Sequence, residues 1–376
     1  MGAMRAISSA LITLLLILLL YAILKGVIAA PTPNNYTSYS TIQQNVSTVS
    51  TVVTMPNSTM LSTSTTTAQT TIPTLVTHQN ASNNNLYGYM LDLINADRSN
   101  YDLTNVTLSS EPSAQQHADS MLANNYFSHW DTYGMKPYMR YTLVGGRGSV
   151  DENIAFIYNS SGINISSNLQ QMEYNFMYND YACCNNGHRD NILNPYHNQV
   201  SIGVAYNSTS IYLVEDFINN YVSWSGGTPS VSNNLDVTLL GTVSSGYSVS
   251  SIQINFDSPV SNLTQQDFSL APYNGSYNDG DTVAGIGYSY GREYFYFSNI
   301  TTINATTYNI NGKNFDISFN MKQLEQQYGP GEYTIMTMLN NGSTSACASG
   351  NCAVFIGAMY TVFVGSDGVP YLPKNV

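Results

Sequence analysis

A run of apolar and weakly polar residues near the N-terminus constrains this 376-residue chain more than any other feature. The run extends over residues 7–24, with Arg5 before it and Lys25 after it. About 20 such residues cross a bilayer as a helix, and a positive charge on the short side favours a cytoplasmic N-terminus. The run therefore predicts a signal anchor over residues 1–30 of a single-pass protein, with the rest of the chain extracellular. Secretion after cleavage near the alanines at 29–30 is the alternative.

The balance of acidic and basic residues limits the kinds of partner that the chain can bind. The chain has 11 Lys and Arg against 23 Asp and Glu, a formal net charge of -12, and only 9% of its residues are charged. Such a surface offers no basic patch for a phosphate backbone, so nucleic acid is excluded as a partner. The predicted partners are the membrane, through the N-terminal helix, and an extracellular or cell-surface ligand. An acidic exterior would suit this composition.

The four cysteines fit an exported chain. Cys347 and Cys352 flank a short segment and predict a possible disulfide. Cys183 and Cys184 are adjacent, which leaves open a disulfide with an unidentified partner, a thiolate metal site or a redox pair. Asn-X-Ser/Thr sequons recur along the chain and predict a glycoprotein wherever the host has the machinery.

Composition and periodicity divide the chain into four parts. Residues 31–84 are rich in Thr, Ser and Asn without a hydrophobic period, which predicts a disordered stalk. Residues 85–224 combine helical patterns with strand-like runs, which predicts helices and a short sheet in one domain. Residues 235–376 read as short strands separated by turns and predict an all-β Ig-like sandwich. The fold class is therefore predicted as α+β.

Three short segments carry ionisable side chains in structure-breaking or aromatic contexts. They centre on His129 in Phe-Ser-His-Trp, on Glu152 in Asp-Glu-Asn-Ile-Ala, and on His188 in Gly-His-Arg-Asp-Asn-Ile-Leu. Two neutral imidazoles with carboxylates match the ligand preferences of Zn²⁺. We interpret His117, near an apolar helix face, as a packed histidine, and His197 as part of a solvated loop.

The order of these segments resembles the CAP superfamily, the SCP-like domains of cysteine-rich secretory, antigen 5 and pathogenesis-related proteins. The resemblance extends from about Leu86 to Trp224 and includes a later Ile-Gly-Val-Ala-Tyr run. Gly-His-Arg replaces the Gly-His-aromatic motif of the eukaryotic branch, so the chain is similar to the prokaryotic branch. The family implies an α-β-α sandwich in the first folded domain.

The resemblance also implies a cleft with two histidines and two acids. Residue by residue, it carries over to His129, Glu152 and His188, and it points to Asn179 or Asp180 for the second acid, of which we favour Asp180. Helical geometry does not decide, because Glu173 shares the apolar stripe of that helix.

The predicted ligand-binding cleft therefore consists of His129, Glu152, Asp180 and His188, with His129 and His188 as possible zinc ligands. The resemblance implies a surface module that binds a metal or a small polar or lipid ligand. A metal-dependent hydrolase of surface peptides or wall polymers, with Glu152 as general base, is one alternative, and an adhesin acting through residues 235–376 is the other. No catalytic residue is identified, since no His-Glu-x-x-His helix or paired nucleophile is visible.

Overall fold

The computed structural model describes residues 80–287, 289–290, 293–294, 300–341 and 353–373, all within the unit Val52–Val376. The predicted anchor, the stalk before residue 80, and Cys347 with Cys352 lie outside these residues. In the part of the chain that is described, no helix combines the length and apolar character needed to cross a membrane. The last five stalk residues, 80–84, are already helical.

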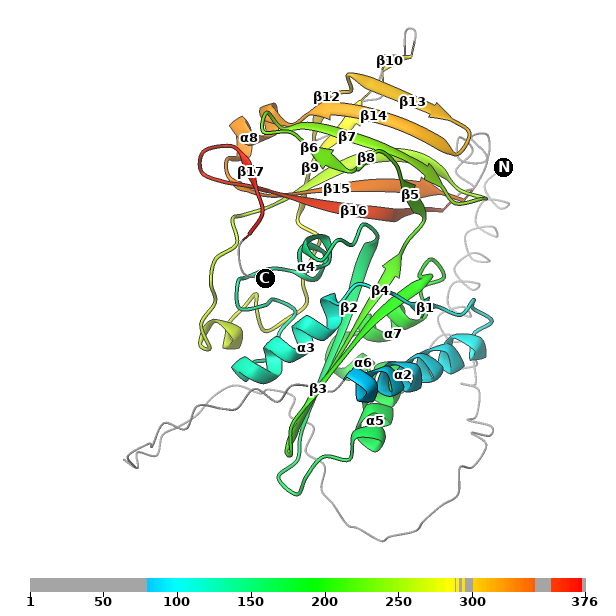
Figure 1. The fold of residues 1–376 in the computed structure, drawn as a ribbon, viewed down its shortest axis with the longest axis vertical. Coiled ribbons are helices and arrows are strands. Elements are labelled where there is room, and N and C mark those ends of the chain that lie inside the picture. The colour runs from blue at the N-terminus through cyan, green and yellow to red at the C-terminus, as the bar shows by residue number, and fades with distance from the viewer. Residues whose placement is uncertain (1–79, 288, 291–292, 295–299, 342–352, 374–376) are drawn as a thin grey trace, which may run out of the picture. The chain divides into compact units, whose positions relative to one another are not determined.

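A four-stranded sheet with helices on both faces occupies residues 80–224 (Figure 1). Its strands, in the order β1-β3-β4-β2, are β1 (Thr107–Leu108), β3 (Gln199–Tyr206), β4 (Ser210–Asn219) and β2 (Ser149–Tyr158). The helices are α2 (Asn80–Asn100), α3 (Ser113–Asn124), α4 (Pro137–Leu143), α5 (Ile165–Tyr178), α6 (Tyr181–Cys184) and α7 (Gly187–Ile192).

The alternation of side chains along β4 explains the layers. Leu213 and Phe217 pack in one apolar cluster with residues of α2 and α5, whereas Tyr212 and Val214 pack in another with residues of α3. Successive side chains of a strand point to opposite faces, so one apolar strand buries both faces of the sheet. The predicted α+β class is confirmed by this α-β-α arrangement.

The backbone of α3 crosses the sheet at Gly203 of β3. A Cβ at this position would lie 2.1 Å from the carbonyl oxygen of Ala114 and 2.6 Å from the backbone nitrogen of Gln115. Only a residue without a side chain lets helix and strand approach this closely.

Gly203→Ala is therefore expected to lower the free energy of unfolding by about 1–3 kcal/mol, because backbone atoms must move to admit the methyl group. Denaturant titration measures this difference. Gly88→Ala is the matched control, since a Cβ at Gly88 would meet nothing within 4 Å and alanine favours a helix. Equal stabilities of the Gly203→Ala and wild-type proteins would contradict the close packing.

Two sheets with a shared apolar core follow from residue 222 onward. The six-stranded sheet has the order β12-β9-β8-β15-β16-β17: β12 (Thr301–Asn304), β9 (Asp281–Gly287), β8 (Ser248–Asp257), β15 (Gly331–Asn340), β16 (Val354–Val364) and β17 (Pro370–Tyr371). The five-stranded sheet consists of β13 (Thr307–Asn311), β14 (Asn314–Asn320), β7 (Asp236–Val243), β5 (Val222–Trp224) and β6 (Ser230–Val231). A small hairpin of β10 (Ser289–Tyr290) and β11 (Glu293–Tyr294), the 3-10 helix η1 (Asp267–Ser269) and helix α8 (Lys322–Tyr328) complete the elements.

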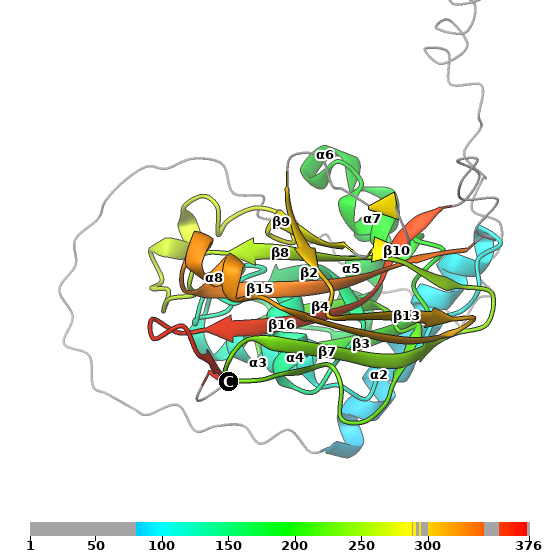
Figure 2. The same cartoon turned by 90° about the horizontal axis from the view of Figure 1, so that it is seen from above.

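Residues of both sheets meet in one core. Leu239 and Ile317 of the five-stranded sheet pack in the same cluster as Ile252 and Ile335 of the six-stranded sheet. Figure 2 shows the long strands of both sheets lying roughly along a common axis. The strand-rich character predicted for residues 235–376 agrees with these sheets, while the Ig-like designation stays a prediction.

The connection between β8 and β9 returns to the helical half (Figure 1, yellow). The backbone nitrogen of Leu263 donates to the carbonyl of Thr132, and the hydroxyl of Ser128 donates to the carbonyl of Tyr273. The ammonium group of Lys136 lies 2.7 Å from a carboxylate oxygen of Asp257 and donates to Asn278. These contacts hold the connection against the loop that carries His129.

Candidate functional site

A cleft of about 540 Å³ lies between the helical half and the β8–β9 connection. Its walls include His129, Glu152 and His188, three of the four residues predicted from sequence. The disulfide residues Cys183 and Cys184 line it as well, and residues 274–279 of the connection form the facing wall. The described structure thus brings the three motif segments to one cavity.

Strand register explains the first half of the site. Glu152 of β2 stands opposite Asp216 of β4, and directly opposed side chains of an antiparallel pair share a face. One carboxylate oxygen of Glu152 lies 2.8 Å from Nδ1 of His129, and the other accepts a hydrogen bond of 2.6 Å from Arg140 of α4. The guanidinium group also donates to the backbone carbonyl of His129, so it positions both the loop and the acid.

The protonation of this network follows from burial. Burial raises the pKa of Asp216 to about 8 and that of Glu152 to about 7, although the charge of Arg140 opposes the rise for both. Asp216 therefore holds the proton of the pair and hydrogen-bonds to Glu152, which remains the carboxylate facing Arg140 and His129. Ser113 of α3 donates to the other oxygen of Asp216 at 2.5 Å.

Burial also lowers the pKa of the His129 imidazole to about 3, and the nearby His188 and Arg140 add to the effect. His129 is consequently neutral at pH 7 and in mild acid. The carboxylate of Glu152 accepts from Nδ1, which leaves Nε2 as the atom with a free lone pair.

Asp180 holds the second histidine. Its Oδ1 lies 2.6 Å from Nδ1 of His188, and its Oδ2 accepts hydrogen bonds from the backbone nitrogens of His188 and Arg189. Although burial opposes it, hydrogen bonds and the charge of His188 lower the pKa of Asp180. The ring of His188 packs at 4.6 Å from the ring of Phe176, which fixes its orientation.

The other acid and amide weighed from sequence lie elsewhere. Asn179 hydrogen-bonds to Asn175 within its own helix. Glu173 faces the opposite side of the sheet and pairs with Glu215 of β4, where both are buried. Among the three candidates, Asp180 is the one that contacts His188.

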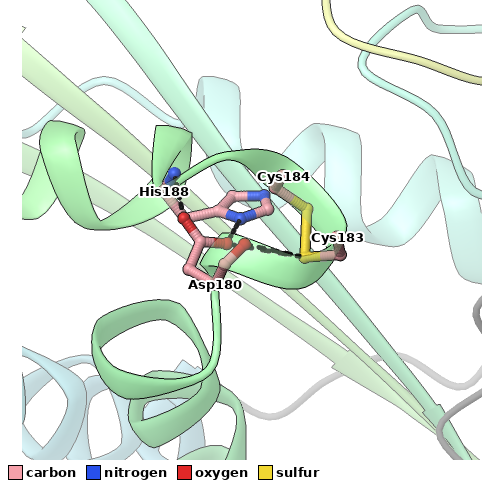
Figure 3. Close-up of side chains that lie close together, drawn as sticks. All are labelled: Asp180, Cys183, Cys184 and His188. Atoms are coloured by element: carbon pink, nitrogen blue, oxygen red, sulfur yellow. Dashed lines mark hydrogen bonds and ion pairs between the residues drawn. A yellow bond between two sulfur atoms is a disulfide. The ribbon is translucent and has the colours of Figure 1, made fainter. Parts of the chain in front are cut away.

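A compact group of metal-ligand types surrounds His188 (Figure 3). One donor atom each from Asp180, Cys183, Cys184 and His188 lies within 4.8 Å of the others. The adjacent cysteines Cys183 and Cys184 form a disulfide with each other. A disulfide is one of the three roles that the sequence allows for them, and each cysteine is the partner of the other. His129 is not part of this group, although it opens into the same cleft.

Three contributors to the site were not predicted from sequence. Asp216 and Arg140 contact the carboxyl group of Glu152 and hold it in place. Tyr277 accepts a hydrogen bond from the backbone nitrogen of Glu152, and its ring lies 5.0 Å from the ring of His129. An acidic residue interrupting the apolar run of β4 was the available signal for Asp216. No signal pointed to Tyr277, because it reaches the cleft from the other half of the chain.

The two other histidines of the described residues, His117 and His197, are both buried, which agrees with the prediction for only one of them. His117 is buried and its Nε2 lies 2.8 Å from the carbonyl oxygen of Ser128, which confirms a packed histidine. The solvated-loop interpretation of His197 is wrong. This side chain is 2% exposed, hydrogen-bonds to Asn219 and stacks on Phe217, both of which belong to strand β4.

The chain is similar to a known protein family and to a solved bacterial structure. The model of the CAP family, described as the cysteine-rich secretory protein family, matches residues 91–222. A crystal structure of an extracellular protein containing a SCP domain from Bacillus anthracis str. Ames is 25% identical, with a TM-score of 0.27. The match covers 35% of this chain and 40% of that one, so the chain spans less than half of its relative. A search of curated proteins gave no significant match.

Proposed function

Residues 91–222 make this chain a member of the CAP superfamily, and we propose that it is an extracellular surface protein whose two-histidine cleft binds a zinc ion or a small polar ligand. The family description, cysteine-rich secretory protein, agrees with the export that the apolar N-terminal run predicts. In this proposal residues 1–30 hold the protein at the membrane and the cleft faces the exterior.

The proposal rests on one observation: each of the two imidazoles is held by a carboxylate at its Nδ1 atom. Nδ1 of His129 is held by Glu152 and Nδ1 of His188 by Asp180. For neither Nε2 atom is a hydrogen-bond partner found among the described residues. Both side chains remain partly exposed, 13% and 16%, at the cleft. A carboxylate on one ring nitrogen orients an imidazole so that the other nitrogen can bind a metal or a ligand donor.

The electrostatics favour a cation or a hydrogen-bond donor as the ligand. Neutral imidazole is the form that binds metal, and the low pKa of His129 keeps it in that form below pH 7. His129 and His188 would hold zinc, which would supply a Lewis acid at the cleft. Asp180 and Glu152 would orient the two rings without themselves binding the ion.

Hydrolysis is less well supported than binding. A general base needs a carboxylate oxygen directed at water, but one oxygen of Glu152 faces His129 and the other faces Arg140. We therefore propose a binding role and assign no catalytic residue.

We expect the full-length protein, kept oxidised at pH 7, to bind one zinc ion that the His129→Ala/His188→Ala variant does not bind. Each imidazole contributes a direct ligand, so removing both removes the site. Isothermal titration calorimetry measures stoichiometry and affinity, and His78→Ala, which changes a histidine outside the described residues, is the matched control. Equal zinc binding by the double variant would refute the assignment, and no zinc binding by wild type would leave only a polar ligand for the cleft.

A further inference from the structure

The disulfide between Cys183 and Cys184 lies on the cleft wall, next to His188 (Figure 3). Cys183 is exposed, Cys184 is half-buried, and both residues line the cleft. Exposed disulfides are open to thiol exchange, whereas buried ones resist it. The bond closes no loop of the chain, because its two residues are neighbours, so breaking it disconnects no distant segments.

The surroundings of Cys183 suit a thiol as well as a disulfide. Its sulfur lies 3.4 Å from the backbone carbonyl oxygen of Asp180 and 3.6 Å from the Oδ1 atom of the same residue. A disulfide sulfur carries no proton for these two acceptors, whereas a thiol would donate to them. The acceptors thus provide a second observation that the local structure accommodates the reduced form.

Reduction would release two sulfur ligands beside an oriented imidazole. The donor atoms of Cys183, Cys184 and His188 already lie within 4.8 Å of one another and of Asp180. Two thiolates and one imidazole form a ligand set for borderline or soft divalent cations, with a fourth position open to the cleft. Asp180 would orient His188 from Nδ1, as it does in the disulfide form.

We propose that reduction of the Cys183–Cys184 disulfide creates a second metal site, formed by both thiolates and His188, for a thiophilic divalent cation. An external dithiol supplies two electrons and two protons, and it is oxidised to its own disulfide while the two cysteines become thiols. Binding of the cation then releases the two thiol protons to solvent. The site differs from the two-histidine arrangement, because it needs neither His129 nor Glu152, and it shares only His188.

Cadmium binding to the full-length protein tests this site, because cadmium thiolates absorb in the ultraviolet by charge transfer. The protein is reduced with a phosphine, which with one water molecule becomes the phosphine oxide as the disulfide becomes two thiols, and excess reagent is removed before titration. We expect one cadmium ion with a thiolate absorption band in reduced protein and no such band in oxidised protein. Asp180→Asn is expected to weaken cadmium binding about 10–100-fold, as loss of an orienting partner does.

The variant Cys183→Ser/Cys184→Ser controls for Cys347 and Cys352, which it retains. Loss of the band in this variant, with unchanged thermal unfolding, supports the proposal, and an undiminished band overturns it. A band retained by His129→Ala separates this site from the two-histidine site. Reduced wild-type protein without a thiolate band overturns the second site even if oxidised protein binds zinc through His129.

Discussion

Replacing Arg140 by methionine is expected to lower the free energy of unfolding by about 3–5 kcal/mol, most strongly above pH 7, because it removes the cation and the hydrogen-bond donor of the buried Glu152 carboxyl group. Arg140 is 4% exposed and Glu152 is 2% exposed, so water cannot take over the lost hydrogen bond of 2.6 Å. The guanidinium group also donates to the carbonyls of His129 and Met135, and both hydrogen bonds would be lost.

A double-mutant cycle separates the charge from the packing. In Arg140→Met/Glu152→Gln no unpaired carboxylate remains, so we expect the double variant to be less destabilised than the sum of the single variants by about 2 kcal/mol. Denaturant titration at pH 7 gives the four free energies. Arg147→Met is the matched control, because Arg147 is half-buried, stacks over Tyr360 and donates to backbone carbonyls. Additive effects at Arg140 and Glu152 would contradict the ion pair as the source of the loss.

The loss of stability caused by Arg140→Met is expected to depend on pH. Burial raises the pKa of Glu152 to about 7 even with Arg140 present, so without the arginine this carboxyl takes a proton more readily still. The destabilisation by Arg140→Met should therefore grow as the pH rises above about 7, where Glu152 of the wild type ionises, and should be smallest in acid, where Glu152 is neutral in both proteins. A loss that is constant from pH 5 to pH 8 would point to packing alone.

Short sequence segments and the family resemblance pointed to His129, Glu152 and His188, which line one cavity, but not to the groups that hold them in place. His129, Glu152 and His188 each stand within a short segment whose neighbours carry the signal. Arg140 and Asp216 act through Glu152 from other elements, and their role follows from the strand register and the placement of α4, which a single sequence does not display. Tyr277 depends on a contact between the two halves of the chain.

The secondary structure is likewise predictable where a local hydrophobic pattern determines it, and not where it depends on pairing with distant strands. Helices α3 and α5 and strands β3 and β4 have hydrophobic periods that match their structure, so local patterns are enough to indicate helices and strands in residues 85–224. Strand β9 has no such pattern, since residues 281–287 contain two glycines and an acidic start, and pairing with β8 and β12 stabilises it instead. Residues 277–279 lie in the cleft wall because of the path of the β8–β9 connection, which the local sequence does not display.

Buried carboxyl groups also make the stability of the whole protein depend on pH. On one face of the sheet, Glu173 and Glu215 lie together, and neither oxygen of Glu173 has a donor among the described residues. Two carboxyl groups in contact satisfy each other only if they share a proton. Burial, with the charge of Asp97, raises the pKa of Glu215 to about 7, although hydrogen bonds from Glu173 and Asn153 oppose the rise. Burial likewise raises the pKa of Glu332 to about 7.

The direction of the pH dependence of stability follows from these raised pKa values. Each such group binds its proton more tightly in the folded than in the unfolded chain, so its contribution to stability is complete below about pH 4.5 and is lost as the pH rises through about 7. A rise from 4.5 to about 7, as at Glu215, corresponds to about 3 kcal/mol. We therefore expect these carboxyl groups to lower the free energy of unfolding by several kcal/mol between pH 5 and pH 8. The buried neutral histidines, whose pKa values are lowered, oppose this fall below about pH 6.5, so the fall is steepest above that pH.

Glu173→Gln tests the carboxyl pair within this trend. Its amide can donate to Glu215 without a shared proton, so we expect the variant to lose less stability between pH 5 and pH 8, with a slope smaller by up to about 1.4 kcal/mol per pH unit, the value for one proton. Denaturant titrations across this range measure the slope, and Asp281→Asn, at an exposed carboxylate, should leave it unchanged. A wild-type protein that gains stability from pH 5 to pH 8 would contradict the whole set of buried acids. An unaltered slope in Glu173→Gln would remove only this pair, because Asp216 and Glu332 would still hold protons in the folded state.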